Sequence, residues 1–101
     1  MDALSFSLKA LTKRVADGAF ATRANRHRGL QAMAGELRQL GFRLPAATSL
    51  KPKHIDALVG HWKAEGVTDA TIRNRLGWAR WWAEQINKPG LVPSSNEQFG
   101  L

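Results

Sequence analysis

The stretch TDATIRNRLGWARWWAEQI, residues 68–86, carries the clearest secondary-structure signal in the chain. At about 100° per residue, one sector of a helix collects its apolar side chains, with Trp82 at the flank; they are Ile72, Leu76, Ala79, Ala83 and Ile86. Thr68 is a predicted N-cap, Asp69 favours the positive end of the helix, and Val67 can pack on Ile72. The pattern predicts a helix with one buried and one exposed face.

The exposed face of this helix is basic, because Arg73 and Arg80 share it with Gly77 and Trp81. Two guanidinium groups, a glycine gap and an aromatic ring suit a phosphate backbone. Trp81 has three interpretations: it completes a broad core, packs on a DNA sugar or groove wall, or docks a partner domain or subunit. Arg75 lies at the edge of the apolar sector, so we expect its stem to pack across a tryptophan.

Three more helices are predicted upstream, since helical spacing of apolar residues recurs and strand alternation does not. The first ends at Gly18, and the second runs from Thr22, a predicted N-cap, to Leu40 before Gly41. The third begins at Pro52 and stops at Gly66. Their stripes are Leu4, Leu8, Leu11 and Val15, then Leu30, Met33, Leu37 and Leu40, then Ile55, Leu58, Val59 and Trp62. We expect an all-α compact bundle of four helices, or five.

Composition points to one small basic domain. Lys and Arg outnumber Asp and Glu by 15 to 8, which gives a net charge of +7 and favours a polyanionic partner. No apolar run approaches the roughly 20 residues that span a bilayer, and the start lacks a signal-peptide core. We therefore expect a cytoplasmic protein with no membrane partner. With no cysteine, the chain has no disulfide framework and no thiolate chemistry.

A search for catalytic groups finds no tyrosine, no glycine-rich phosphate loop and no paired carboxylates with an obvious role. His54 and His61 share a helix face, but two turns separate them by about 10 Å, too far for one metal ion. His27 is either a hydrogen-bond donor to phosphate or a solvated surface residue. We expect no catalytic residue, no cofactor and no metal site in this chain.

Residues 50–86, LKPKHIDALVGHWKAEGVTDATIRNRLGWARWWAEQI, resemble the core-binding, SAM-like N-terminal domain of phage-type integrases, the tyrosine recombinase family. The resemblance rests on a helix that ends at Gly66, a capped helix with Thr71 and Ile72 at its start, and a later pattern of Leu, a small residue and Arg followed by aromatics. That last pattern comprises Leu76, Gly77, Arg80, Trp81 and Trp82. Upstream, residues 23–42, RANRHRGLQAMAGELRQLGF, are similar to the family's first long helix.

The resemblance implies a four-helix domain that grips duplex DNA at a recombination site. In this family a tyrosine nucleophile in a separate C-terminal domain cuts the DNA, so this chain would be a non-catalytic fragment. Residues 1–87 would form the DNA-binding domain, and residues 88–101, rich in Pro, Gly and Ser, a linker or tail toward the catalytic domain. Expected partners are double-stranded DNA, the catalytic domain of the same bacterial or phage-encoded protein and other integrase protomers.

The candidate DNA contacts follow from charge and expected exposure, and most should bind phosphates. They are Arg23, Arg26, Arg28, Arg38, Lys51, Lys53, Thr71, Arg73, Asn74 and Arg80. Among exposed polar residues, Gln31, Arg73 and Asn74 are the ones expected to read base edges. Two alternative functions remain: a helical protein-interaction module that uses an exposed Trp81 and the apolar flank, and, last in rank, a membrane-surface role.

Overall fold

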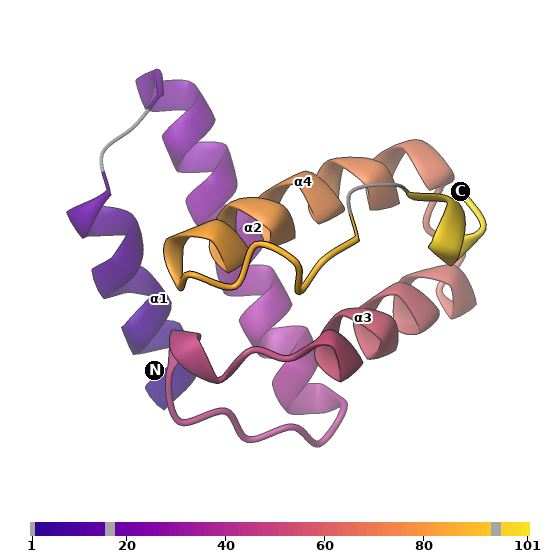
Figure 1. The fold of residues 1–101 in the computed structure, drawn as a ribbon, viewed down its shortest axis with the longest axis horizontal. Helices are drawn as coiled ribbons and strands as arrows, with labels where there is room; N and C mark the ends of the chain where they lie inside the picture. Colours follow the sequence, from indigo (N-terminus) through magenta and orange to yellow (C-terminus); the bar gives the residue numbers. More distant parts are fainter. Residues whose placement is uncertain (1, 16–17, 94–95) are drawn as a thin grey trace. The chain divides into compact units, whose positions relative to one another are not determined.

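The computed structural model describes residues 2–15, 18–93 and 96–101. Four α-helices and two short 3-10 helices account for the regular structure in these ranges (Figure 1). They are α1 (Ala3–Arg14), α2 (Phe20–Gln39), η1 (Ala47–Ser49), α3 (Pro52–Ala64), α4 (Asp69–Gln85) and η2 (Asn96–Phe99). The described ranges contain no strand, so the predicted all-α fold with four helices is confirmed.

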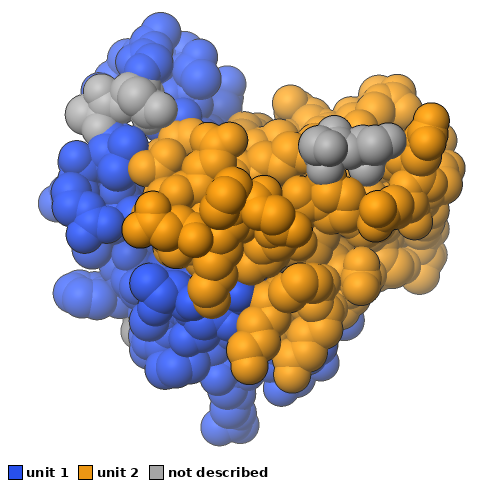
Figure 2. Space-filling view, in the orientation of Figure 1, with its two compact units in different colours: residues 1–50 blue, residues 51–101 orange. Residues whose placement is uncertain are grey.

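The chain divides into two compact units, which Figure 2 colours separately. Unit 1, residues 1–50, contains α1, α2 and η1; unit 2, residues 51–101, contains α3, α4 and η2. In sequence, unit 1 has eight Lys and Arg against three Asp and Glu, whereas unit 2 has seven against five. Most of the net positive charge of the chain therefore belongs to unit 1.

In unit 1, α1 packs against α2. Most of the predicted apolar stripes supply this contact, since Leu4, Leu8 and Leu11 are buried on α1 and Leu30, Met33 and Leu37 on α2. The predicted end of the first helix at Gly18 was wrong, because α1 ends at Arg14, and the last stripe residues, Val15 and Leu40, are C-caps that are half-buried and exposed. Two polar contacts fix the arrangement: Gln31 Nε2 donates to the Ser5 carbonyl at 3.0 Å, and the Ala47 amide donates to the Ser7 hydroxyl at 2.9 Å. The second bond ties η1 to α1.

The start of α2 differs from the prediction. The helix begins at Phe20 with Ala19 as its N-cap, and no side chain caps it, so the assignment of Thr22 as N-cap was wrong. Ala19 suffices because its extended backbone lets its carbonyl accept the first helical hydrogen bond, from the Arg23 amide at 3.0 Å. A side-chain cap adds only about 1 kcal/mol to that, and a helix this long with a buried stripe forms without it.

Three helices end in the same way. After α2 the Phe42 amide donates to the Leu37 carbonyl and Gly41 has φ +92°, and after α3 the Val67 amide donates to the Trp62 carbonyl with Gly66 at φ +76°. Asn87, at φ +59°, holds the corresponding position after α4. A left-handed residue with this hydrogen bond is the Schellman motif. The predicted stops at Gly41 and Gly66 are therefore confirmed.

Unit 2 is built on α3 and α4, whose starts match the prediction. Pro52 occupies the first turn of α3, and the Thr68 hydroxyl caps α4 by accepting from the Thr71 amide at 3.4 Å. The two helices bury their predicted stripes except for Ile86, which is the C-cap of α4 and half-buried. Trp62 and Trp82 are the largest of the fully buried side chains. Fully burying each indole stabilises the fold by about 4–6 kcal/mol as an upper estimate from its area.

The segment after α4 folds back onto unit 2. Leu91, Val92 and Phe99 are buried, and Lys63 Nζ donates a hydrogen bond to the Phe99 carbonyl. The Pro, Gly and Ser content of residues 88–101 predicts a linker or tail and does not indicate that any of its residues are buried. Three scattered apolar residues have no helical or strand period, which is why sequence patterning did not reveal that they pack. That the segment leads toward a catalytic domain stays a prediction.

Candidate nucleic-acid interface

The first two turns of α4 present three of the predicted contact residues together. Thr71, Arg73 and Asn74 are all exposed there, and the Thr71 hydroxyl accepts from Thr68 Oγ1 at 3.0 Å. They lie at the N-terminal end of the helix, where the backbone dipole favours a negatively charged ligand. One cation, one hydroxyl and one amide are the groups that bind phosphate and base edges.

Gly77 lies one turn beyond Arg73 on the same helix and is exposed. A Cβ atom built at this position would meet no other atom within 4 Å, so packing inside the protein does not require a glycine here. Glycine inside a helix costs roughly 0.5–1 kcal/mol relative to alanine. An unpacked glycine beside these polar groups leaves the helix backbone open to close approach by another molecule.

Arg80 does not share the situation of Arg73. It is half-buried, and its Nε and Nη2 donate to the Pro93 carbonyl at 3.0 and 2.8 Å. Nη2 also donates to Asn96 Oδ1. The seven-residue spacing correctly places both arginines on one side of the helix. Pro93 and Asn96, in the segment after α4, accept hydrogen bonds from Arg80.

Arg75 packs on an aromatic ring, as predicted. Its Cζ lies 5.2 Å from the centroid of the Trp62 ring, within the range of a cation–π interaction. This contact joins α4 to α3 and directs the Arg75 guanidinium toward the core edge. Of the neighbouring pair Arg73 and Arg75, one is thus an exposed cation and the other a packing element.

The start of α3 collects positive charge around a buried histidine. Lys51 and Lys53 are exposed, whereas His54 is buried and its Nδ1 accepts from the Lys51 amide at 2.9 Å. Burial lowers the pKa of His54, and the positive charges of Lys53, Lys51 and Lys88 lower it further. The neutral imidazole therefore acts as a cap for α3, and the lysines carry the charge.

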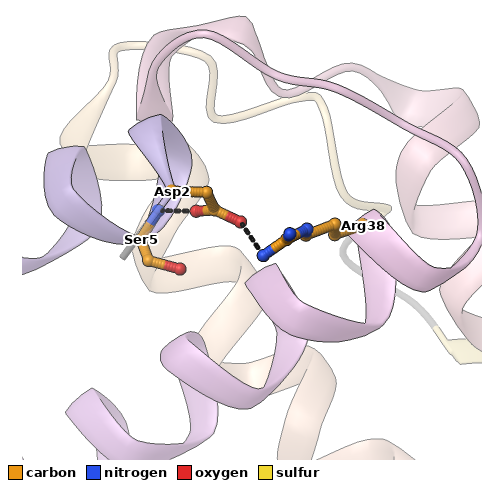
Figure 3. Close-up of polar contacts among 3 residues, drawn as sticks. All are labelled: Asp2, Ser5 and Arg38. Carbon is orange, nitrogen blue, oxygen red and sulfur yellow. Dashed lines mark hydrogen bonds and ion pairs between the residues drawn. The ribbon is translucent and has the colours of Figure 1, made fainter.

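On α2, Arg28 and Arg38 are exposed as predicted. Arg28 Nη2 donates to Asn25 Oδ1 of its own helix, and Arg38 Nη1 lies 3.9 Å from an oxygen of Asp2 (Figure 3). The Asp2 carboxylate also caps α1 by accepting from the Ser5 amide at 2.8 Å, and the pKa of Asp2 is lowered chiefly by hydrogen bonds to Ser5 and then by Arg38. A pair of this kind between accessible groups contributes little, about 0–1 kcal/mol.

Two other arginines of α2 are less accessible than predicted. Arg26 is buried with 8% of its surface exposed, and Arg23 is half-buried. The position of Arg26 has a simple cause, because it precedes Leu30 by four residues and Met33 by seven and so continues the buried stripe of the helix. The same helical spacing that located the core could have excluded it from the exposed face.

These observations describe an all-α protein with basic groups on exposed helix faces in both units. A family model described as "Phage integrase, N-terminal" matches residues 1–88. The chain belongs to the phage integrase N-terminal family. The match confirms the SAM-like resemblance drawn from the sequence and covers both stretches on which it rested. No curated protein and no solved structure gave a significant match.

In this integrase N-terminal chain, the aromatic residue singled out from the sequence is not the most exposed one. Trp81 is half-buried, although the alternative interaction function required it to be exposed. The exposed large apolar side chains among the described residues are Phe6 at 68%, Phe20 at 83% and Leu40 at 37%. The two phenylalanines lie outside the apolar stripes of their helices, so helical spacing could have predicted that they are exposed.

The described residues of this integrase N-terminal chain form neither a metal site nor a membrane-spanning helix. Within residues 2–15, 18–93 and 96–101, no three His, Cys, Asp or Glu side chains are grouped as a metal site would require. In the same ranges each helix is too short or too polar to pass through a bilayer.

Proposed function

We propose that this chain is the DNA-binding domain of a site-specific recombinase and grips duplex DNA at the recombination site through its basic helix faces. The observation that carries the proposal is the family match over residues 1–88, since the family contains the N-terminal domains of phage integrases. The net charge of +7 supports it, because neutralising phosphates supplies most of the affinity of such domains.

In unit 2 the proposal assigns the start of α4 to the DNA. Arg73 and Thr71 bind phosphate oxygens, and Asn74 reaches a base edge, where an amide can pair with adenine. Lys51 and Lys53 at the start of α3 add phosphate contacts of the second rank. Arg80 contributes less to DNA binding than Arg73 does in this proposal, because Pro93 and Asn96 accept hydrogen bonds from its guanidinium.

In unit 1 the proposal assigns Arg28 and Arg38 to phosphates. Gln31, which was expected to be exposed and to read a base edge, is half-buried and its Nε2 donates to the Ser5 carbonyl, so it is not assigned to the DNA. Arg38 is 73% exposed in its side chain, and its 3.9 Å pair with Asp2 is too weak to hold it against a phosphate. Within the described part of the chain, Arg28 is held by a hydrogen bond to Asn25 of its own helix. Arg23 and Arg26, which are half-buried and buried, contribute to the local potential more than to direct contacts.

The chemistry of strand transfer lies outside this chain in the proposal. The chain contains no tyrosine, and family members cut DNA with a tyrosine in a separate C-terminal domain. We therefore propose that residues 88–101 lead toward that domain, and that other integrase protomers on the same DNA are further partners. The protein would act in the cytoplasm, where its DNA substrate is.

The salt dependence of binding to a labelled DNA duplex tests the proposal. With about five to seven phosphate contacts, log affinity should fall with log salt at a slope of about −4.5 to −6. Arg28→Gln and Arg73→Gln should each flatten the slope by about one. Arg75→Gln is the matched control, because Arg75 lies over Trp62, and it should leave the slope unchanged. Binding that is absent, or that does not respond to salt, contradicts the proposal.

A further inference from the structure

Unit 1 contains a groove between α1 and α2 that the proposed DNA contacts do not use, apart from Arg23. It encloses about 240 Å³. Lys9 and Lys13 line it from α1, and Phe20 and Arg23 from α2. The Phe20 ring is 83% exposed, although it is the largest apolar group at the groove. A pocket with three cations and an unburied ring is matched by a ligand that is both acidic and apolar.

The Thr12 hydroxyl in the wall of the groove already has two partners. Thr12 Oγ1 donates to the Lys9 carbonyl at 3.0 Å and lies 3.1 Å from His27 Nδ1. A hydroxyl has one proton, so both contacts are hydrogen bonds only when Nδ1 carries a proton and donates to Thr12. The proton of the Thr12 hydroxyl is therefore committed to the Lys9 carbonyl. The other polar side chains that line the groove are the His27 ring and the cations Lys9, Lys13 and Arg23, which favour an occupant with acidic flanks.

The size and charge of the groove limit further which molecules can occupy it. The volume is below the roughly 300–1,000 Å³ typical of cofactor and drug sites, and it is enough for a large side chain. A DNA duplex keeps its bases stacked and offers mainly phosphates and sugars, and a sugar presents less apolar surface to such a pocket than a large apolar side chain does. A second copy of this chain carries the same +7 charge, so electrostatic repulsion opposes it.

We propose that this groove binds an acidic protein segment that inserts one large apolar side chain beside Phe20. Lys9, Lys13 and Arg23 then pair with carboxylates on either side of the inserted residue. Unit 1 holds most of the positive charge of the chain, which adds long-range attraction to such a segment. The proposed function goes beyond DNA binding, because Phe20, Lys9 and Lys13 are not among the proposed DNA contacts; Arg23 is the one residue that the groove shares with them.

A labelled peptide with two adjacent leucines flanked by glutamates tests the proposal with the full chain, by fluorescence anisotropy. The peptide should bind saturably, and Phe20→Ala should weaken binding about tenfold, as loss of an aromatic anchor does. Phe6→Ala is the matched control, since Phe6 is also an exposed ring of unit 1 but does not line the groove. It should leave peptide affinity unchanged. Circular dichroism of both variants checks that the helices persist.

A second peptide, with serines in place of the leucines, separates specific docking from general charge attraction. It should bind much more weakly than the leucine peptide. Equal binding of the two peptides, or equal effects of Phe20→Ala and Phe6→Ala, would overturn the proposal. So would a loss of duplex DNA affinity in Phe20→Ala without loss of peptide affinity, because the groove would then belong to the DNA surface. Failure of DNA binding alone would leave the peptide result standing.

Discussion

Arg80 and Pro93 are joined by two hydrogen bonds, from Nε and Nη2 of the guanidinium to the carbonyl oxygen, at 3.0 and 2.8 Å. The carbonyl is thirteen residues away, so this contact closes the segment after α4 onto the helix. An arginine assigned to DNA from its helical position is thereby part of the internal structure of unit 2.

Replacing Arg80 with alanine should therefore lower the free energy of unfolding by about 1–2 kcal/mol, because hydrogen bonds to a charged donor are lost. Arg80→Lys should not restore stability fully, since an ammonium cannot donate two fork-shaped bonds to one carbonyl. Urea denaturation measures the change, and limited proteolysis should show faster cleavage after residue 88. An Arg80→Ala protein as stable as the parent would show that the contact does not hold the segment.

Arg73 and Arg75 are neighbours with opposite expected roles. Arg75→Ala should lower the free energy of unfolding by about 0.5–1 kcal/mol, since it removes the cation–π contact with Trp62. Arg73→Ala, at an exposed position, should change it by less than about 0.5 kcal/mol. Thermal denaturation of the two variants side by side measures the difference, and a reversed order of stability would refute the assignment.

Two substitutions at Gly77 test its effect on stability and its effect on DNA binding separately. Gly77→Ala should raise the free energy of unfolding by about 0.5–1 kcal/mol, because the position is helical and nothing lies within 4 Å of the added carbon. Gly77→Gln, with a longer neutral side chain, should weaken duplex DNA binding by holding the backbone of α4 away from the phosphates.

Gly60 provides the control for that experiment, because it is an exposed glycine within α3 with the same open surroundings. Gly60→Gln should leave DNA affinity unchanged. If the two glutamine variants bind DNA equally well, the missing side chain at Gly77 does not help α4 to approach the DNA.

His54 predicts a pH dependence of stability. Its pKa is lowered in the folded state from the ordinary value of 6.5, so the unfolded chain takes up this proton more readily. The free energy of unfolding should consequently fall as the pH drops below 6.5 and level off below the folded pKa. His54→Gln keeps an acceptor for the Lys51 amide but does not titrate, so its stability should vary less over this window.

Urea denaturation of both proteins at several pH values measures this difference. The other two histidines are present in both proteins and cancel in the comparison. Asp2 does not interfere, because its pKa is lowered from 3.8 and its stabilising contribution is lost only at more acidic pH. Identical pH profiles for the two proteins would show that burial of His54 has no energetic consequence.

Helical spacing was enough to predict the four helices, most of the core stripes and the position of Arg75 over a tryptophan, because each depends on residues three or four apart. Val15, Leu40 and Ile86 left the predicted stripes because each is the C-cap of its helix. Helical spacing failed where distant contacts decide. Arg80 is occupied by Pro93 and Asn96, and neither partner has a periodic relation to it. The capless start of α2 at Phe20 could not be foreseen because backbone hydrogen bonds alone set it. The expectation that Arg26 is exposed failed for a different reason, since helical spacing already placed Arg26 in line with the buried residues Leu30 and Met33 of α2.

The attachment of the last residues to two helices has a mechanical consequence. Lys63 of α3 holds the carbonyl of Phe99, and Arg80 of α4 holds that of Pro93. Tension applied at residue 101 would load α3 first and reach α4 only after the Lys63 bond has given way. While the Lys63 bond holds, α3 would bear the load and the contact between Arg80 and Pro93 would be shielded from it.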